Sequence, residues 1–101
     1  MADDRTPAQK IVGKRISALR AERHISQQDL GELADIHFTN IGKIERGEVN
    51  PTLVTLLRIA VALEVDVGEL IQGLSAEALP SKTHKITVSE LIAARAKGSP
   101  V

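Results

Sequence analysis

Residues 38–46 (FTNIGKIER) place polar and apolar side chains on opposite sides when the segment is wound as a helix. At roughly 100° per residue, Ile41 and Ile44 fall on one side, and Thr39 and Lys43 fall on the other. A lysine ammonium can donate to guanine, an asparagine amide can pair with adenine, and threonine or phenylalanine can contact the methyl group of thymine. We therefore identify four candidate base-reading residues, which are Phe38, Thr39, Asn40 and Lys43.

Three of these residues also have an ordinary structural explanation, which the sequence leaves open. Phe38 is the only aromatic residue of the chain, and burial in a core is the commoner position for phenylalanine. Asn40 can hydrogen-bond to its own backbone, and Lys43 can simply face the solvent. Gly42, on the same side, lowers helix propensity by roughly 1 kcal/mol. A close approach to DNA would explain that glycine, and so would random variation.

Capping sequences and a sharp turn make this segment the third predicted helix. Residues 6–9 (TPAQ) are typical of a helix start, so we expect a first helix over residues 7–23. Residues 26–29 (SQQD) begin a short second helix, and residues 35–37 are so few that the chain must turn sharply before the third. Gly47 is a left-handed stop. We expect these helices to bury Val12, Ile16, Leu19, Leu30, Leu33, Ala34, Ile41 and Ile44.

Two further helices and a tail complete the predicted architecture. Residues 50–52 (NPT) break the chain and start a fourth helix, and residues 66–69 (DVGE) cap a short fifth helix that ends near Gly73. Residues 74–86 have the composition of a linker, and the capping box at residues 87–90 (TVSE) predicts a tail helix over residues 87–97. The fold class is therefore all-α, with a five-helix domain over residues 6–73. We expect the fourth and fifth helices to bury Leu53, Leu56, Leu57, Ala60, Leu63, Val67, Leu70 and Ile71.

The composition limits the classes of protein to which the chain can belong. A length of 101 residues fits one domain, and 43% apolar residues with 1% aromatic suit a helical core of aliphatic side chains. The chain has no cysteine, its three histidines lack metal-ligand spacing, and no sequence suggests a phosphate loop or a nucleophile with its base. We expect neither an enzyme nor a metal or cofactor. No apolar run reaches the length of a membrane span, and we expect a cytoplasmic protein.

The net charge is formally zero, whereas proteins that bind nucleic acids are usually basic. The charges are unevenly distributed, however. Residues 10–23 hold five cations and one acid, and residues 54–79 hold one cation and four acids. The molecule can therefore have one basic and one acidic face, so the net charge does not exclude DNA as a partner.

Two short helices joined by a three-residue turn, between a longer helix and a helical pair, form the helix-turn-helix pattern. Residues 12–71 resemble the phage repressor/Cro (XRE-type) family, which includes controller proteins of restriction–modification systems. The resemblance lies in residues 25–30 (ISQQDL), 41–47 (IGKIERG) and 50–51 (NP), and in residues 53–63 followed by Val65. It implies a repressor-like, five-helix DNA-binding domain in which residues 38–46 form the recognition helix.

The resemblance also implies roles for single residues. Gln27 matches a glutamine that bonds a phosphate, and Arg20 and Glu45 match a pair that braces the domain. A carboxylate at a helix C-terminus faces the negative end of the dipole and would repel phosphate, so Glu45 should turn inward to a cation. Relatives often have glycine at the position of Asp35, which requires a left-handed backbone, and Ser or Thr at the N-cap position of His37. The expected contacts to the DNA backbone are Gln27, His37, Arg46, Asn50 and Arg15.

We therefore expect a sequence-specific DNA-binding transcription regulator that acts as a homodimer on a palindromic operator and has no small-molecule effector. A dimer would place two recognition helices about 34 Å apart. Its contact surface would be either the tail helix or exposed residues of the fourth and fifth helices, such as Val54, Val61, Val65 and Val67. The alternative is a protein-binding module, an antitoxin or an adaptor, for which DNA binding is secondary.

Overall fold

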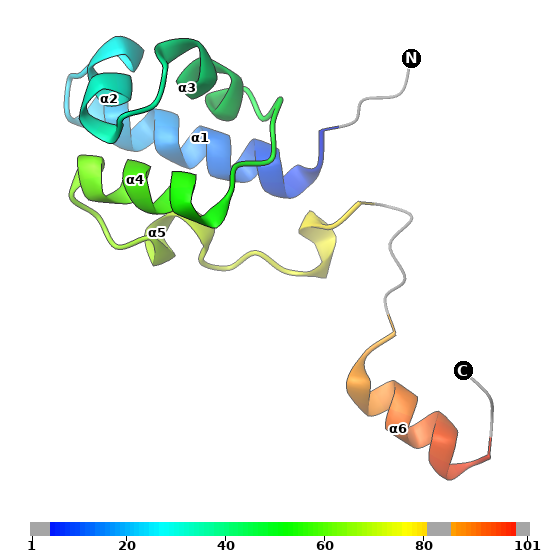
Figure 1. Cartoon of the computed structure of the whole chain (residues 1–101). Coiled ribbons are helices and arrows are strands. Elements are labelled where there is room, and N and C mark those ends of the chain that lie inside the picture. The colour runs from blue at the N-terminus through cyan, green and yellow to red at the C-terminus, as the bar shows by residue number, and fades with distance from the viewer. Residues whose placement is uncertain (1–4, 81–85, 99–101) are drawn as a thin grey trace.

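The computed structural model describes residues 5–80 and 86–98, and this part of the chain is all helical. In chain order the elements are α1 (Pro7–Glu22), α2 (Gln27–Ala34), α3 (Phe38–Glu45), α4 (Leu53–Leu63), α5 (Gly68–Ile71), the short 3-10 helix η1 (Ala76–Ala78) and α6 (Val88–Ala96). Figure 1 shows α2 and α3 on one side of α1, with α4 and α5 on the other. The fold class predicted from the sequence is confirmed. None of the described helices is long and apolar enough to cross a membrane.

Polar side chains satisfy the free N–H groups at the start of the first two helices. Thr6 and Gln9 form a capping box on α1, and Ser26 and Asp29 form another on α2, as predicted from the sequence. Replacing such a cap by alanine typically costs about 1 kcal/mol. These caps fix the helix starts, and therefore the angle at which the chain enters each helix.

Two glycines let α1 and α2 approach the segment around α3 closely. A Cβ atom on Gly13 of α1 would lie 2.4 Å from the carbonyl oxygen of Ile44, and one on Gly31 of α2 would lie 2.5 Å from that of Ile36. No real Cβ atom tolerates such distances, so the backbone spacing at both positions depends on glycine. The turn between α2 and α3 passes through Asp35, whose φ of 57° is left-handed, as expected at this position.

The core lies between α1, α2, α3, α4 and α5. Its largest fully buried side chains are Ile16, Leu30, Ile41, Ile59, Leu63 and Leu70. Ile41 and Ile44 are buried as predicted, so the amphipathic phase of α3 is confirmed.

The predicted core is wrong at four positions, because Leu33, Leu53, Leu57 and Ile71 are exposed. The fourth helix is apolar around most of its circumference (LVTLLRIAVAL), and periodicity alone therefore does not identify its inward side. The structure turns Ile59 inward, a residue missing from the prediction, and leaves the side of Leu57 outside. Leu33 is 64% exposed because the short α2 buries only the side that carries Leu30 and Ala34.

Of the linker expected over residues 74–86, residues 81–85 lie outside the described residues, and the described part after α5 includes a short helix. Helix η1 returns to α1 and buries Ala78. Packing therefore continues past residue 73, the expected end of the domain. The tail helix is present as α6, capped by Thr87, with no buried residue, and it stands apart from the other helices in Figure 1.

Candidate nucleic-acid interface

The outer side of α3 presents the four candidate base-reading residues together. Phe38, Thr39, Asn40 and Lys43 are all exposed, and the isoleucines of the same helix are buried. Phe38 is 44% exposed, so it does not take the buried position that is commoner for phenylalanine. The helix thus offers an aromatic ring, a hydroxyl, an amide and an ammonium group on one accessible surface.

An ion pair holds the C-terminal end of α3 against α1. Arg20 donates to both carboxylate oxygens of Glu45, from Nε at 2.8 Å and from Nη2 at 3.0 Å. The Glu45 side chain is only 5% exposed, so the expected inward-turned carboxylate is present. The hydrogen bond to Glu45 raises the pKa of Arg20, because it favours the charged guanidinium.

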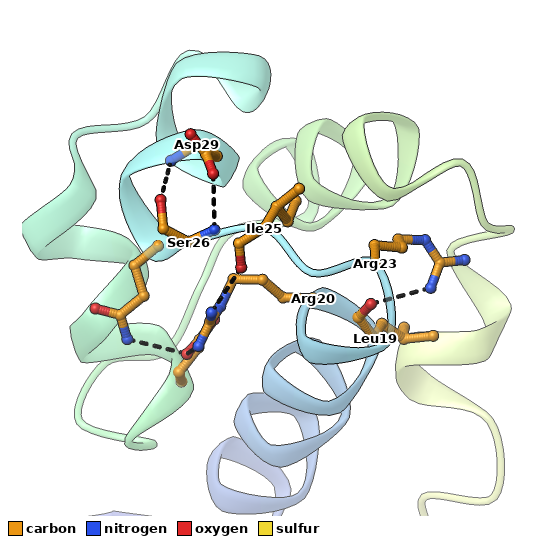
Figure 2. A network of polar contacts seen from close by, with 8 residues as sticks. Leu19, Arg20, Arg23, Ile25, Ser26 and Asp29 are labelled. Carbon is orange, nitrogen blue, oxygen red and sulfur yellow. Dashed lines mark hydrogen bonds and ion pairs between the residues drawn. The ribbon is translucent and has the colours of Figure 1, made fainter.

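The same arginine also fixes the start of α2. Its Nη1 donates to the carbonyl oxygen of Ile25 at 2.9 Å, directly before the Ser26–Asp29 capping box. Figure 2 shows Arg20 beside Ile25, with Ser26 and Asp29 bonded to each other's backbone. One side chain of α1 therefore positions both helices of the helix-turn-helix.

Gln27, expected to bond a phosphate, uses its amide within the protein. Its Nε2 donates to Oε1 of Glu45 at 3.0 Å, so Arg20, Glu45 and Gln27 form one network. Of the two explanations left open for Gly42, a close approach to DNA does not fit the structure. It is buried, and a Cβ atom there would meet Arg46 Nη1 at 3.0 Å and Gln27 Oε1 at 3.4 Å. The absence of a side chain makes room for these two, not for a base.

His37, which stands at the N-cap position where relatives often have Ser or Thr, caps the N-terminus of α3. Its Nδ1 accepts the backbone N–H of Thr39 at 3.2 Å and lies 2.8 Å from Thr39 Oγ1. The imidazole also stacks on the ring of Phe38, with the centroids 4.8 Å apart. Three consecutive side chains at the helix start therefore form one contact group.

Cations gather at the other end of α3. Arg46 forms an ion pair with Glu48 at 2.9 Å and stays exposed. The pKa of Glu48 is lowered, first because Arg46 donates to its carboxylate and also because the charges of Arg5 and Lys43 attract it. Three positive charges therefore act on this carboxylate, which lies just beyond the C-terminal end of α3. Asn50, which we also expected to contact the DNA backbone, is exposed in the connection between α3 and α4.

Arg15, which we expected to contact the DNA backbone, does not lie at α3. Its Nη1 donates to the carbonyl oxygens of Leu70 at 3.1 Å and of Gln72 at 2.7 Å. It therefore satisfies free carbonyls at the end of α5. The sequence could not distinguish this capping of α5 from a phosphate contact, because both need a cation on the outer side of α1.

Sequence reasoning missed two residues that support this surface. Gln9, found only as part of a capping box, also donates from Nε2 to the carbonyl oxygen of Gly47 at 3.3 Å. Arg5 donates to the carbonyl oxygen of Arg46 at 3.4 Å. The capping box pointed to Gln9 as a cap of α1 but not to its bond with Gly47. No sequence motif pointed to Arg5. Both tie the start of α1 to the end of α3.

Another exposed surface is apolar and lies on α4. Val61 is 75% exposed, and its apolar neighbours on the same helix, together with Leu33 of α2, are exposed as well. Of the four valines expected at a dimer contact, Val54 and Val61 belong to this surface, whereas Val65 and Val67 are partly buried against the core. We refer to Leu33, Leu53, Val54, Leu57 and Val61 as the apolar surface of α4.

Comparisons with known proteins agree with this arrangement. The model of the helix-turn-helix family HTH_3 matches residues 16–70. The control protein C.SmaI of Serratia marcescens is 39% identical over 70 residues, which cover 67% of this chain and 83% of that protein.

Solved structures are similar in fold as well. The restriction–modification controller protein C.AhdI of Aeromonas hydrophila has 34% identity and a TM-score of 0.61, over 61% of this chain and 94% of that one. The P22 c2 repressor, solved in complex with a synthetic operator, has 31% identity and a TM-score of 0.59, over 63% and 97% of the two chains.

Proposed function

Because the chain belongs to the helix-turn-helix family, we propose that it is a transcription regulator that binds a specific double-stranded DNA sequence. The observation that carries the proposal is the exposed polar side of α3, whose buried side is locked to α1 and α2. In this motif the second helix enters the major groove, and residues near its N-terminus reach the base edges. The protein acts where the DNA is, in the cytoplasm, and does so without a catalytic step.

Base reading falls to the exposed residues of α3, and phosphate contacts fall to the residues at its two ends. Lys43 donates to guanine and Asn40 pairs with adenine, while Phe38 and the methyl group of Thr39 offer apolar contacts to thymine methyl groups. Arg46 supplies a cation to the backbone, and Arg5 adds a second. The second N–H of the Gln27 amide, the amide of Asn50 and the Nε2 of His37 hydrogen-bond to phosphate oxygens. The network of Arg20 and Glu45 keeps this surface rigid without touching the DNA.

The regulator is a homodimer on a palindromic operator. A single helix reads few base pairs, so specificity against a genome requires two copies. The apolar surface of α4 supports this proposal, because contiguous exposed apolar residues mark a contact with another protein. On such an operator the two α3 helices must lie about 34 Å apart, the distance of one helical turn of DNA.

The test is selection of bound duplexes from random DNA, followed by titration of the best duplex. We expect a palindromic consensus, and we expect Thr39→Ala with Lys43→Ala to lower affinity for it by about 10-fold or more. The matched control is Lys97→Ala, which removes a cation after α6 and should leave binding unchanged.

Salt dependence separates this function from that of a protein-binding module. Binding that neutralises several phosphates weakens steeply with rising salt, by about 10³-fold or more between 50 and 200 mM for six or more contacts. An apolar partner surface shows no such slope. If no consensus emerges and the weak binding that remains is equal for all duplexes, DNA recognition through α3 is excluded.

A further inference from the structure

At the start of α3, Nδ1 of His37 lies within hydrogen-bond distance of two atoms of Thr39. Nδ1 of His37 lies 3.2 Å from the backbone nitrogen of Thr39 and 2.8 Å from its Oγ1. A ring nitrogen that accepts an N–H carries no proton of its own. The shorter contact must therefore also have Nδ1 as the acceptor, with the threonine hydroxyl as the donor.

This assignment fixes the proton positions of both side chains. The neutral imidazole of His37 carries its proton on Nε2, which leaves one N–H free to donate outward. The hydroxyl proton of Thr39 is held by Nδ1, so Oγ1 faces the solvent with lone pairs only. Thr39 therefore presents a methyl group and a hydrogen-bond acceptor, but no donor.

We propose that His37 sets the base preference of Thr39 by holding its hydroxyl proton. In the major groove, the exocyclic amino groups of adenine and cytosine are donors, whereas guanine offers acceptors at N7 and O6 and thymine offers O4. An acceptor-only threonine selects adenine or cytosine by hydrogen bond. His37 is thus a positioning residue for specificity, beyond its contact with the DNA backbone.

The stacked ring of Phe38 makes the arrangement rigid. Its centroid lies 4.8 Å from that of the imidazole, with 26° between the two planes. A ring that stacks on Phe38 while accepting two hydrogen bonds from Thr39 has little freedom to rotate. All three side chains are exposed, so the group reaches DNA without rearrangement.

The proposal rests on the proposed DNA-binding function and is tested by the base preference at each position of the selected operator. We expect the wild-type protein to favour adenine or cytosine over guanine at one position in each half-site. Thr39→Val keeps the methyl group and removes the hydroxyl, and we expect that preference to fall by about five-fold, the usual value of one hydrogen bond.

His37→Ala frees the hydroxyl proton of Thr39, and we expect the same position to accept guanine. His37→Asn keeps a side-chain oxygen that can cap the helix and accept the hydroxyl proton, so it should restore the preference for adenine or cytosine. In the Thr39→Val background, His37→Ala should change the preference no further. His24→Asn, in the turn between α1 and α2, is the matched control and should behave as wild type.

The outcomes separate this proposal from the function on which it rests. If the wild-type protein selects no consensus, the DNA-binding function itself is wrong. If it selects a consensus and His37→Ala preserves every base preference, His37 does not set specificity. Additive effects of His37→Ala and Thr39→Val on base preference would also overturn the proposal, because they would show that the two residues act separately.

Discussion

Helices α3 and α4 pack against the same core but expose opposite chemistry. Each buries an isoleucine completely, Ile41 in α3 and Ile59 in α4. The exposed side of α3 is polar and is held by side chains from α1 and α2. The exposed side of α4 is apolar, and its polar neighbour is a long ion pair of 3.4 Å between Arg58 and Asp35. The contrast indicates that one surface is built for a hydrogen-bonding partner and the other for an apolar one.

The largest effect is expected where the support of α3 is removed. Arg20→Ala leaves the carboxylate of Glu45 buried without its cation, and we expect a loss of about 3 kcal/mol in the free energy of unfolding. Thermal or urea denaturation measures it. Replacing both residues by leucine should cost less than Arg20→Ala, because no unpaired charge remains. An unchanged melting temperature in Arg20→Ala would show that the ion pair does not brace the domain.

A smaller loss is expected from Gly13→Ala, because its Cβ atom would lie 2.4 Å from the carbonyl oxygen of Ile44. Helix α1 must then move away from α3, at a cost of about 2 kcal/mol. Ala18→Gly is a control on the exposed side of the same helix and should cost about 1 kcal/mol, through helix propensity alone. A Gly13→Ala variant as stable as wild type would contradict the close approach of the two helices.

The apolar surface of α4 should govern assembly and not folding. Val61→Asp places a charge on a side chain that is 75% exposed, so stability should change by no more than about 0.5 kcal/mol. We expect sedimentation to show a monomer, with weaker binding to the palindromic operator. Val88→Asp on α6, where the valine is similarly exposed, is the matched control. If Val88→Asp dissociates the dimer and Val61→Asp does not, the tail is the contact surface.

The smallest effect is expected at the cap of α2. The backbone N–H of Ser26 lowers the pKa of Asp29 by hydrogen bonding to its carboxylate. A lowered pKa in the folded state means that the ionised form stabilises the fold above about pH 4, and that this contribution is lost as the pH falls through the folded-state pKa. Asp29→Ala should lower the melting temperature slightly at pH 7, with a difference from wild type that shrinks in acid. A difference that is constant with pH would argue against this bond.

The two helices also show what sequence can predict. In α3 the polar and apolar residues alternate with the helical period, so the exposed side and the buried isoleucines follow from spacing. The inward position of Glu45 follows from its place at the negative end of the helix dipole. In α4 almost every position is apolar, and only packing against α1 and α2 decides that Ile59 turns inward and Leu57 outward. Periodicity carries information only where the two sides of a helix differ.

The candidate site shows the same limit for polar residues. A cation on α1 can face DNA or cap another helix, and the partner of Arg15 became evident only once α5 was placed beside it. For Gly42 the helical position left open whether the glycine serves a close approach to DNA, and only the structure shows that the side chains of Gln27 and Arg46 cover it. Such contacts join residues far apart in sequence, which spacing within one helix cannot reveal.

The central claim is that α3, not α4, meets DNA, and amide chemical shifts of the labelled protein test it most directly. On titration with the selected duplex, we expect the largest shifts at Thr39, Asn40 and Lys43, and small shifts at Val54 and Val61. A scrambled duplex should give weaker shifts at the same three residues. Shifts concentrated on the apolar surface of α4, with the amides of α3 unmoved, would contradict the account.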